Sequence, residues 1–388
     1  MKKRILALLM ALAMTLALAA CGGSDPKPEE PANGGDDTQQ AGQTAGIPAD
    51  ELKIGLVLIG DQADAYSFNH IVGMEAAMLA LDLDPAQLIV KANVSENADC
   101  ETAILELVEA GCHVVFTNSF GHEEHLLRVA PDYPDVQFCA ATGFRSAIDD
   151  LDNTHNYFAE IHQARYLSGV VAGLKTESNI LGYVAAKDYA EVISGYTAFY
   201  LGAKSVNPEV TMYVNYTNEW SDPAKEATNA TALIGLGCDV IGQHSDTTAP
   251  ATTAEQAGVF AVGYNDDMIP AAPAAALTSA RINWGVYYEM ALGALLSGDA
   301  IPQDWCEGLA EGAVYLSELN MDLLDESIVE AVDTAREAIL DGTCNVFDGP
   351  LLDAEGNEIV ADGEFFYENE ESSAPSWDKI IAGVNVLS

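Results

Sequence analysis

The chain has 388 residues, of which 60 are acidic and 16 are basic, and its formal net charge is −44. Such a charge repels polynucleotides and anionic membrane surfaces, so we expect no nucleic-acid partner and no direct adsorption to lipid. We interpret the acidity as a solvated surface that keeps an exported protein soluble, with attraction of a cationic ligand as the alternative.

The first residues predict export and lipidation. The basic segment 1–4 precedes an apolar run, 5–18, which is too short to span a bilayer comfortably. The run ends at Leu18-Ala19-Ala20-Cys21, where small residues precede a cysteine as they do in bacterial lipoprotein cleavage sites. We therefore predict a signal peptide over 1–20, a lipid on Cys21, and an anchor on the extracytoplasmic face of the cell membrane.

The rest of the chain divides into a tether and a folded part. Residues 21–50 are rich in Gly, Pro, Asp and Glu, which predicts a flexible acidic tether. The remainder exceeds what one hydrophobic core usually holds, so two lobes are expected. The expected boundaries are 51–157 with 284–312 for lobe I, 158–283 with 313–370 for lobe II, and 371–388 for a C-terminal segment.

Within the lobes, apolar runs alternate with helical patterns, which predicts an α/β fold with parallel sheets covered by helices on both faces. The expected strands are 52–59, 87–94, 113–117 and 136–142, then 180–185, 210–217, 239–243, 259–263 and 277–282. The expected helices are 73–83, 101–110 and 123–130, then 192–203, 225–236 and 252–258. Segments 105–143 and 231–264 share one order of elements, so the two lobes look like related units.

Polar loops follow the predicted strands, and in open parallel sheets such loops form the ligand crevice. The loops are 60–69, 118–123, 142–145, 218–223, 244–250 and 264–268. Two of them stand out because they place Phe68 and Trp220 beside hydrogen-bonding side chains, so rings from opposite lobes can sandwich a flat heterocycle. The alternative is that each ring packs inside its own lobe.

The candidate ligand-binding residues come from these loops and from the expected re-entry into lobe I after Ile282. They are Tyr66, Phe68, Asn69, Asn118, Thr142, Gly143, Trp220, Asp246, Asp266 and Trp284. Helix N-capping is an equal alternative for the two aspartates, and hinge packing is the alternative for Trp284.

Catalytic signatures are missing from the sequence. There is no GxSxG, no Walker A motif and no GxGxxG with a distal acid, so we expect neither catalysis nor a cofactor. His122 and His125 stand three apart rather than four, so no metal site is expected. Six cysteines besides Cys21 have no regular spacing and look like small buried side chains. A bridge between Cys306 and Cys344 stays open.

Several elements in order resemble the basic membrane protein (BMP) family of substrate-binding lipoproteins, which serve ABC importers for purine nucleosides and related compounds. The resemblance runs from about Leu52 to Gly349 and continues into the tail. It is carried by SFN (67–69), YPDVQFCAATG (133–143), ARYLSGVVAG (164–173), GAKSVNPEV (202–210), NEWSDPAKE (218–226), DVIGQHSDTTAP (239–250), GYNDDM (263–268), LTSARINWGVYY (277–288) and VFDGPLLDAEG (346–356).

This resemblance implies a type I periplasmic-binding-protein fold, in which three crossings join two Rossmann-like lobes. It also implies a purine ring stacked by Phe68 and Trp220, polar contacts from Asn69, Asp246 and Asp266, and an ABC permease as partner of a monomeric receptor. Several elements are closer to the branch that is associated with free purine bases. In the nucleoside branch an acid follows the fourth strand and holds the ribose, whereas this chain has Thr142-Gly143.

The expected function is therefore capture of a purine base or nucleoside between two lobes and its delivery to an ABC transporter. Two other classes remain as alternatives. A surface lipoprotein acting as an adhesin or sensor would use its exterior, and a purine-processing enzyme would need an acid–base pair, for which His70 with Asp266 is the candidate.

Overall fold

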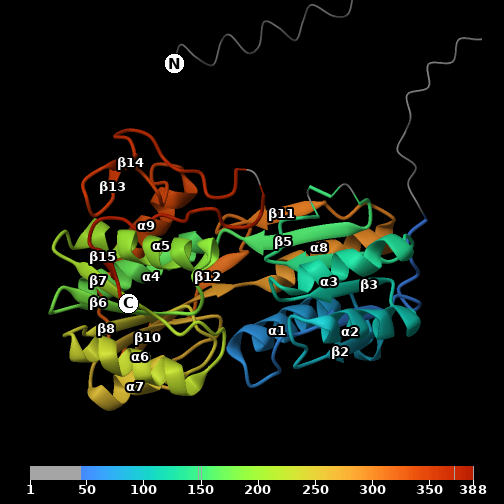
Figure 1. Cartoon of the computed structure of the whole chain (residues 1–388), viewed down its shortest axis with the longest axis horizontal. Helices are drawn as coiled ribbons and strands as arrows, with labels where there is room; N and C mark the ends of the chain where they lie inside the picture. Colours follow the sequence, from blue (N-terminus) through green and yellow to red (C-terminus); the bar gives the residue numbers. More distant parts are fainter. Residues whose placement is uncertain (1–44, 147, 150, 371, 388) are drawn as a thin grey trace, which may run out of the picture. The chain divides into compact units, whose positions relative to one another are not determined.

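The computed structural model describes residues 45–387 apart from 147, 150 and 371, and these residues form two α/β lobes (Figure 1). Cys21, the expected signal peptide and most of the expected tether lie outside the described residues. Within the part that is described, no helix combines the length and the apolar character needed to cross a bilayer.

The first lobe is built on a sheet of six strands among the described residues, all paired in parallel. Across the sheet they are β11 (Asp304–Glu307), β5 (Thr154–Ala159), β4 (Gln137–Ala141), β3 (Val114–Thr117), β1 (Ile54–Val57) and β2 (Leu88–Lys91). Its helices are α1 (Ala65–Ala80), α2 (Ala98–Glu109), α3 (His122–Val129) and α8 (Trp284–Ser297), with short 3₁₀ turns at Pro85–Gln87 and Ala130–Asp132.

The central strand β1 shows why both faces of this sheet are covered. Leu56 is in register with Val90 on β2 and Phe116 on β3, and the whole of β1 is buried. Leu56 packs into the cluster that contains α1 and α8, whereas its neighbour Val57 packs into the cluster that contains α2 and α3. Successive strand residues point to opposite faces, so a continuous apolar run requires helices on both sides.

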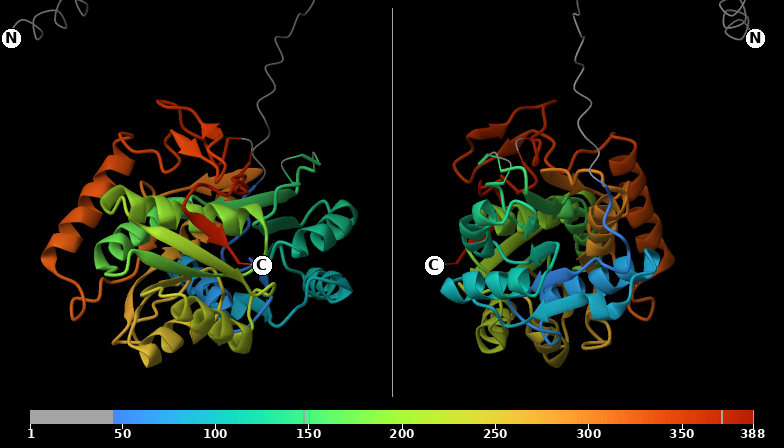
Figure 2. Two further views of the ribbon diagram at one scale, coloured as in Figure 1. Left: turned by 60° about the vertical axis from the view of Figure 1, so that its left-hand side comes forward. Right: turned by 90° about the vertical axis from the view of Figure 1, so that its right-hand side faces the viewer.

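The second lobe has a sheet of seven strands within the described residues. They are β12 (Val314–Leu316), β10 (Ala276–Ile282), β9 (Phe260–Tyr264), β8 (Val240–Gln243), β6 (Ile180–Ala185), β7 (Thr211–Tyr216) and β15 (Val384–Val386), and β12 alone is antiparallel to its neighbour. The helices are α4 (Ile161–Lys175), α5 (Ala190–Val206) and α9 (Glu326–Leu340) on one face, and α6 (Pro223–Gly235) and α7 (Ala249–Ala257) on the other (Figure 2).

The chain passes between the two sheets three times. It crosses from β5 to β6 through α4, from β10 to β11 through α8, and from β11 directly to β12. The predicted α/β class with two Rossmann-like lobes is confirmed, and every expected strand and helix overlaps an observed one. We propose lobe boundaries close to those expected, while the C-terminal segment adds β15 to the second sheet.

One expectation is wrong in a way that matters for the site. Helix α1 begins at Ala65 instead of near Gly73, so residues 66–70 lie in its first turns and not in a loop. The reason is Asp64, whose carboxylate accepts the backbone N–H of Ser67 at 2.8 Å and caps the helix.

The C-terminal residues fold onto the second lobe. A small antiparallel pair, β13 (Leu351–Leu352) and β14 (Glu358–Val360), leads to Trp377, which is buried and stacks on Phe347 with ring centroids 4.9 Å apart. Among the described residues, Cys306 and Cys344 are free thiols, so the bridge that the sequence left open is not formed.

Candidate ligand-binding site

A cavity lies between the lobes, where the strands of both sheets end. The lining residues of the first lobe are Ile59, Tyr66, Asn118, Ser119, Phe120 and Thr142, and those of the second lobe are Glu191, Trp220, His244, Asp246 and Tyr264. Both lobes therefore contribute aromatic and polar groups to one shared space.

The structure brings half of the expected residues to this cavity, namely Tyr66, Asn118, Thr142, Trp220 and Asp246. Phe68 and Asp266 line a more open groove, which adjoins the cavity because Trp220 and Asp246 border both spaces. The remaining candidates, Asn69, Gly143 and Trp284, line neither space.

Two of those remaining residues hold α1 to the end of β10 and to α8, which form the second crossing between the lobes. The Asn69 amide donates to the carbonyl of Ile282 at 2.7 Å and accepts from Arg281 at 3.2 Å. Trp284 is buried and stacks on His70 with ring centroids 4.2 Å apart. We therefore place both residues in hinge packing, which for Trp284 was the alternative to lining the ligand.

Gly143 is required by close packing at the end of β4. A Cβ at this position would clash with the carboxylate of Glu123 and with the amide of Asn156. Glu123 is buried and accepts the backbone N–H groups of Phe144 at 3.2 Å and Arg145 at 2.8 Å. The glycine thus lets a buried carboxylate fix the loop that carries Thr142.

In the first lobe, hydrogen bonds lock the loops after β1 and β3 together. The Tyr66 hydroxyl donates to the carbonyl of Asn118 at 2.6 Å, and the Asn118 side chain accepts from the N–H of Ile59 at 2.8 Å. Both contacts are made by cavity residues, so they fix the positions of Tyr66 and Asn118 in this wall.

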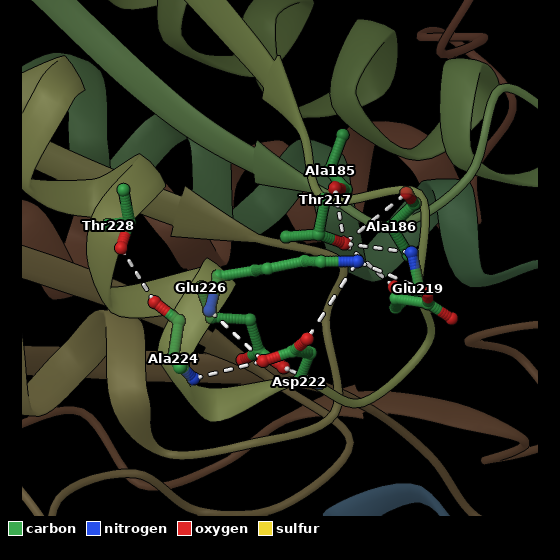
Figure 3. Close-up of polar contacts among 9 residues, drawn as sticks. Ala185, Ala186, Thr217, Glu219, Asp222, Ala224, Glu226 and Thr228 are labelled. Carbon is green, nitrogen blue, oxygen red and sulfur yellow. Dashed lines mark hydrogen bonds and ion pairs between the residues drawn. The ribbon is translucent and has the colours of Figure 1, made fainter.

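In the second lobe, the loop that carries Trp220 is fixed on both sides (Figure 3). Before it, the Thr217 hydroxyl donates to the carbonyl of Glu219 at 2.7 Å and lies 3.4 Å from the carbonyls of Ala185 and Ala186. After it, the Asp222 carboxylate caps α6 by accepting the N–H groups of Ala224 at 3.2 Å and Lys225 at 3.1 Å. These contacts hold the half-buried Trp220 at the cavity.

His244 and Glu191 form a polar pair on the cavity wall, with His244 Nε2 lying 3.3 Å from Glu191 Oε1. Burial lowers the pKa of His244 to about 4, and the nearby Arg165 guanidinium adds to the effect, so the imidazole is neutral at pH 7. The carboxylate of Glu191 can only accept, which places the imidazole proton on Nε2.

Sequence reasoning missed both of these residues. Glu191 lies just beyond the polar turn that follows the predicted strand 180–185, and this turn is not one of the six loops expected to form the crevice. The same rule, a polar loop after a buried strand, would have pointed to it. His244 stood inside a loop that was considered, as did Ser119, Phe120 and Tyr264.

Asp246 is the buried acid of the site. Its carboxylate accepts from the Asn265 amide at 2.9 Å. Burial raises the pKa of Asp246 well above its usual range, and the carboxyls of Asp64, Glu226 and Glu191 raise it further. A carboxyl held in this state can either accept or donate a hydrogen bond.

Several polar atoms around the cavity are buried and, within the described residues, have no hydrogen-bond partner. They are Thr142 Oγ1, Trp220 Nε1, His244 Nδ1 and Tyr264 OH. Leaving such a group unpaired costs about 1–3 kcal/mol. Thr142 also has a φ of 59°, a conformation that β-branched residues rarely adopt and that is often found at functional sites.

The charge of the lining restricts the ligand. Among the described residues, the cavity is lined by two carboxyl groups, Glu191 and Asp246, and by no lysine or arginine. A phosphorylated or carboxylated ligand would meet repulsion there. A neutral ring that bears N–H donors would find aromatic faces and acceptors.

The acid–base pair considered for an enzyme is not assembled. His70 is buried, and its Nδ1 lies 2.6 Å from the Tyr288 hydroxyl, whereas Asp266 pairs with Arg281 at 3.3 Å on the second lobe. Burial lowers the pKa of His70 well below its usual range.

Comparison with known proteins agrees with this architecture. The basic membrane protein family model, described as ABC transporter substrate-binding protein PnrA-like, matches residues 64–344. A purine-binding protein of Brucella abortus is 35% identical over 337 residues, which cover 87% of this chain and 93% of that protein. A proposed ABC transporter glucose-binding protein of Haloferax volcanii is 34% identical over 280 residues, covering 72% of this chain and 70% of that protein.

Among solved structures, an ABC transporter solute-binding protein of Conexibacter woesei aligns with a TM-score of 0.64 and 20% identity, covering 76% of this chain and 98% of its own. This likeness identifies the fold as that of type I periplasmic binding proteins, as predicted. ABC substrate-binding proteins capture solutes outside the cytoplasm and deliver them to a transporter. The chain belongs to the PnrA-like family of ABC transporter substrate-binding proteins.

Proposed function

We propose that this chain captures a purine base between its lobes and delivers it to an ABC importer. The observation that carries the proposal is the cavity that joins Tyr66 and Phe120 of the first lobe to Trp220 and Tyr264 of the second. Aromatic faces stack on a flat heterocycle, while Asp246, Glu191 and the buried unpaired groups form hydrogen bonds with the polar atoms at its edge.

The loop after β4 favours a base over a nucleoside. The family resemblance implies that nucleoside-binding relatives have an acid for the ribose at this point, whereas this chain has Thr142-Gly143. The buried carboxylate beside this loop, Glu123, does not line the cavity and accepts from the N–H groups of Phe144 and Arg145 and from the Asn156 amide.

The proposal includes a lipid anchor, an extracytoplasmic location and a monomeric state. The signal sequence and Cys21 support a lipid anchor on the extracytoplasmic face, and the receptor acts as a monomer without catalysing a reaction. The purine-binding relative supports the ligand class, and the proposed glucose-binding relative makes a sugar the rival ligand.

Isothermal titration of the full chain in detergent tests the ligand. Adenine should bind one to one and more tightly than adenosine, and glucose should give no binding heat. If glucose binds and adenine does not, a sugar would take the place of the purine as the proposed ligand. Recovery of unchanged adenine after long incubation would exclude a purine-processing enzyme. Capture of a protein partner by a chain that binds no purine would favour the adhesin function.

A further inference from the structure

Glu96 lies on the first lobe, between β2 and α2, and holds the cavity loop that follows β3. One carboxylate oxygen accepts from the Ser119 hydroxyl at 2.7 Å and from the N–H of Gly121 at 2.9 Å. A Cβ at position 121 would come within 2.7 Å of the Glu96 side chain, so glycine permits the approach. Ser119 and its neighbour Phe120 line the cavity, although Glu96 itself does not.

Lys187 lies on the second lobe, in the turn between β6 and α5. Its ammonium nitrogen is 5.0 Å from the centroid of the Trp220 ring and 5.9 Å from that of Tyr189. These distances fall within the range of cation–π attraction. Like Glu96, Lys187 does not line the cavity, but it holds a ring that does.

The two residues meet across the lobes. Lys187 Nζ is 3.5 Å from Glu96 Oε2, and each side chain is 22% exposed. Among the lysine and arginine ion pairs of the described residues, this pair alone joins one lobe to the other. A pair that is largely shielded from water is screened less by salt than a surface pair.

We propose that Glu96 and Lys187 are positioning residues that latch the two cavity walls together, so that they set how long the closed lobes retain a ligand. The carboxylate fixes the loop of Phe120, the ammonium fixes Trp220, and their contact joins the two. When the lobes separate, this contact is lost while each wall keeps its other bonds. The latch therefore acts on ligand release and leaves association nearly unchanged.

The choice of adenine as probe rests on the proposed function. In stopped-flow measurements on the full chain, Lys187→Met and Glu96→Gln should each raise the dissociation rate about fivefold, as loss of a half-buried pair predicts. The double variant should be no faster than the faster single variant, because either change breaks the same contact. Lys187→Arg, which can both pair and stack, should restore slow release.

Lys91→Met is the matched control. Lys91 pairs with Glu106 inside the first lobe at 2.6 Å and has a similar exposure of 32%. Adenine should dissociate from Lys91→Met at the same rate as from the wild type. Additive effects in the double variant, or an equal effect of Lys91→Met, would overturn the latch.

A second measurement separates failure of the latch from failure of the purine proposal. Hydrogen–deuterium exchange of residues 118–121, measured without ligand, should accelerate in Lys187→Met although the change is on the other lobe, and should stay unchanged in Lys91→Met. Unchanged exchange in Lys187→Met would contradict the latch. If the wild type takes no adenine, the purine proposal fails while the exchange result still decides the latch.

Discussion

The backbone N–H of Ala65 donates to the carbonyl oxygen of Asp246 at 3.1 Å, a hydrogen bond that joins the first residue of α1 to the loop after β8. The two residues belong to different lobes, so the contact exists because the lobes are closed on each other. It also seals the carboxyl group of Asp246 into the site, where burial keeps its pKa well above the usual range.

Asp246→Asn should therefore change how stability depends on pH. A carboxyl whose pKa is raised by folding stabilises the folded state below its unfolded pKa, and this contribution is lost as pH rises. The variant keeps an oxygen for Asn265 but cannot ionise, so it should melt at a higher temperature than the wild type at pH 7. The difference should shrink towards pH 4. Asp82→Asn, an exposed control, should show no such trend.

Trp220→Ala should weaken adenine binding at least tenfold, equivalent to about 1.4 kcal/mol, because it removes the aromatic wall of the second lobe. Isothermal titration measures the loss. Leu79→Ala, on the outer side of α1 where Leu79 is 82% exposed, is the control and should bind normally. Normal affinity in Trp220→Ala would assign the ring to packing alone.

Phe68→Ala should cost less affinity than Trp220→Ala, since Phe68 lines the adjoining groove rather than the cavity itself. Titration of both variants with adenine gives the comparison. Equal losses would mean that the purine lies in the groove between Phe68 and Trp220, as the family resemblance implies.

The different positions of Tyr66 and Phe68 could not be predicted from the sequence. The alternation of apolar runs and polar loops was sufficient to predict both sheets, because buried parallel strands need continuous apolar stretches. Tyr66 and Phe68 were both expected in a loop, where either could reach a ligand. Once Asp64 starts the helix at Ala65, residues two apart point away from each other, so one faces the cavity and the other the groove.

The positions of two other candidates could not be predicted from the sequence for a related reason. Asn69 and Trp284 stand in polar or aromatic clusters, yet their partners, Ile282, Arg281 and His70, are distant in sequence or on another helix. Only the packing of α8 on α1 decides that these side chains serve the hinge. Glu191, in contrast, was within reach of the loop rule.

Glu368 should make docking of the C-terminal residues depend on pH. Burial raises the pKa of Glu368 to about 7 from 4.5, although the N–H of Trp377 donates to its carboxylate at 2.9 Å. The raised pKa stabilises the fold below pH 4.5, and that contribution is lost as pH rises to 7. Relative to the wild type, Glu368→Gln should gain up to about 3 kcal/mol across this window.

Denaturant unfolding at several pH values measures that gain, with Glu358→Gln at the exposed first residue of β14 as the control. A difference between Glu368→Gln and the wild type that does not change from pH 4.5 to 7 would contradict the assignment.

Cys21→Ala should abolish the lipid anchor. Cells grown with labelled palmitate should incorporate label into the wild-type chain and not into the variant, which should appear in the soluble fraction. Cys344→Ala is the control, since its thiol lies in the folded part and should leave labelling unchanged. Incorporation of labelled palmitate into Cys21→Ala would contradict lipid attachment at Cys21.

A crystal structure of the chain grown with adenine tests the central claim most directly. We expect the base inside the cavity, with its ring against Trp220 and its N–H donors facing Asp246 or Glu191. Adenine bound outside the cavity, or a cavity that takes glucose in its place, would contradict it.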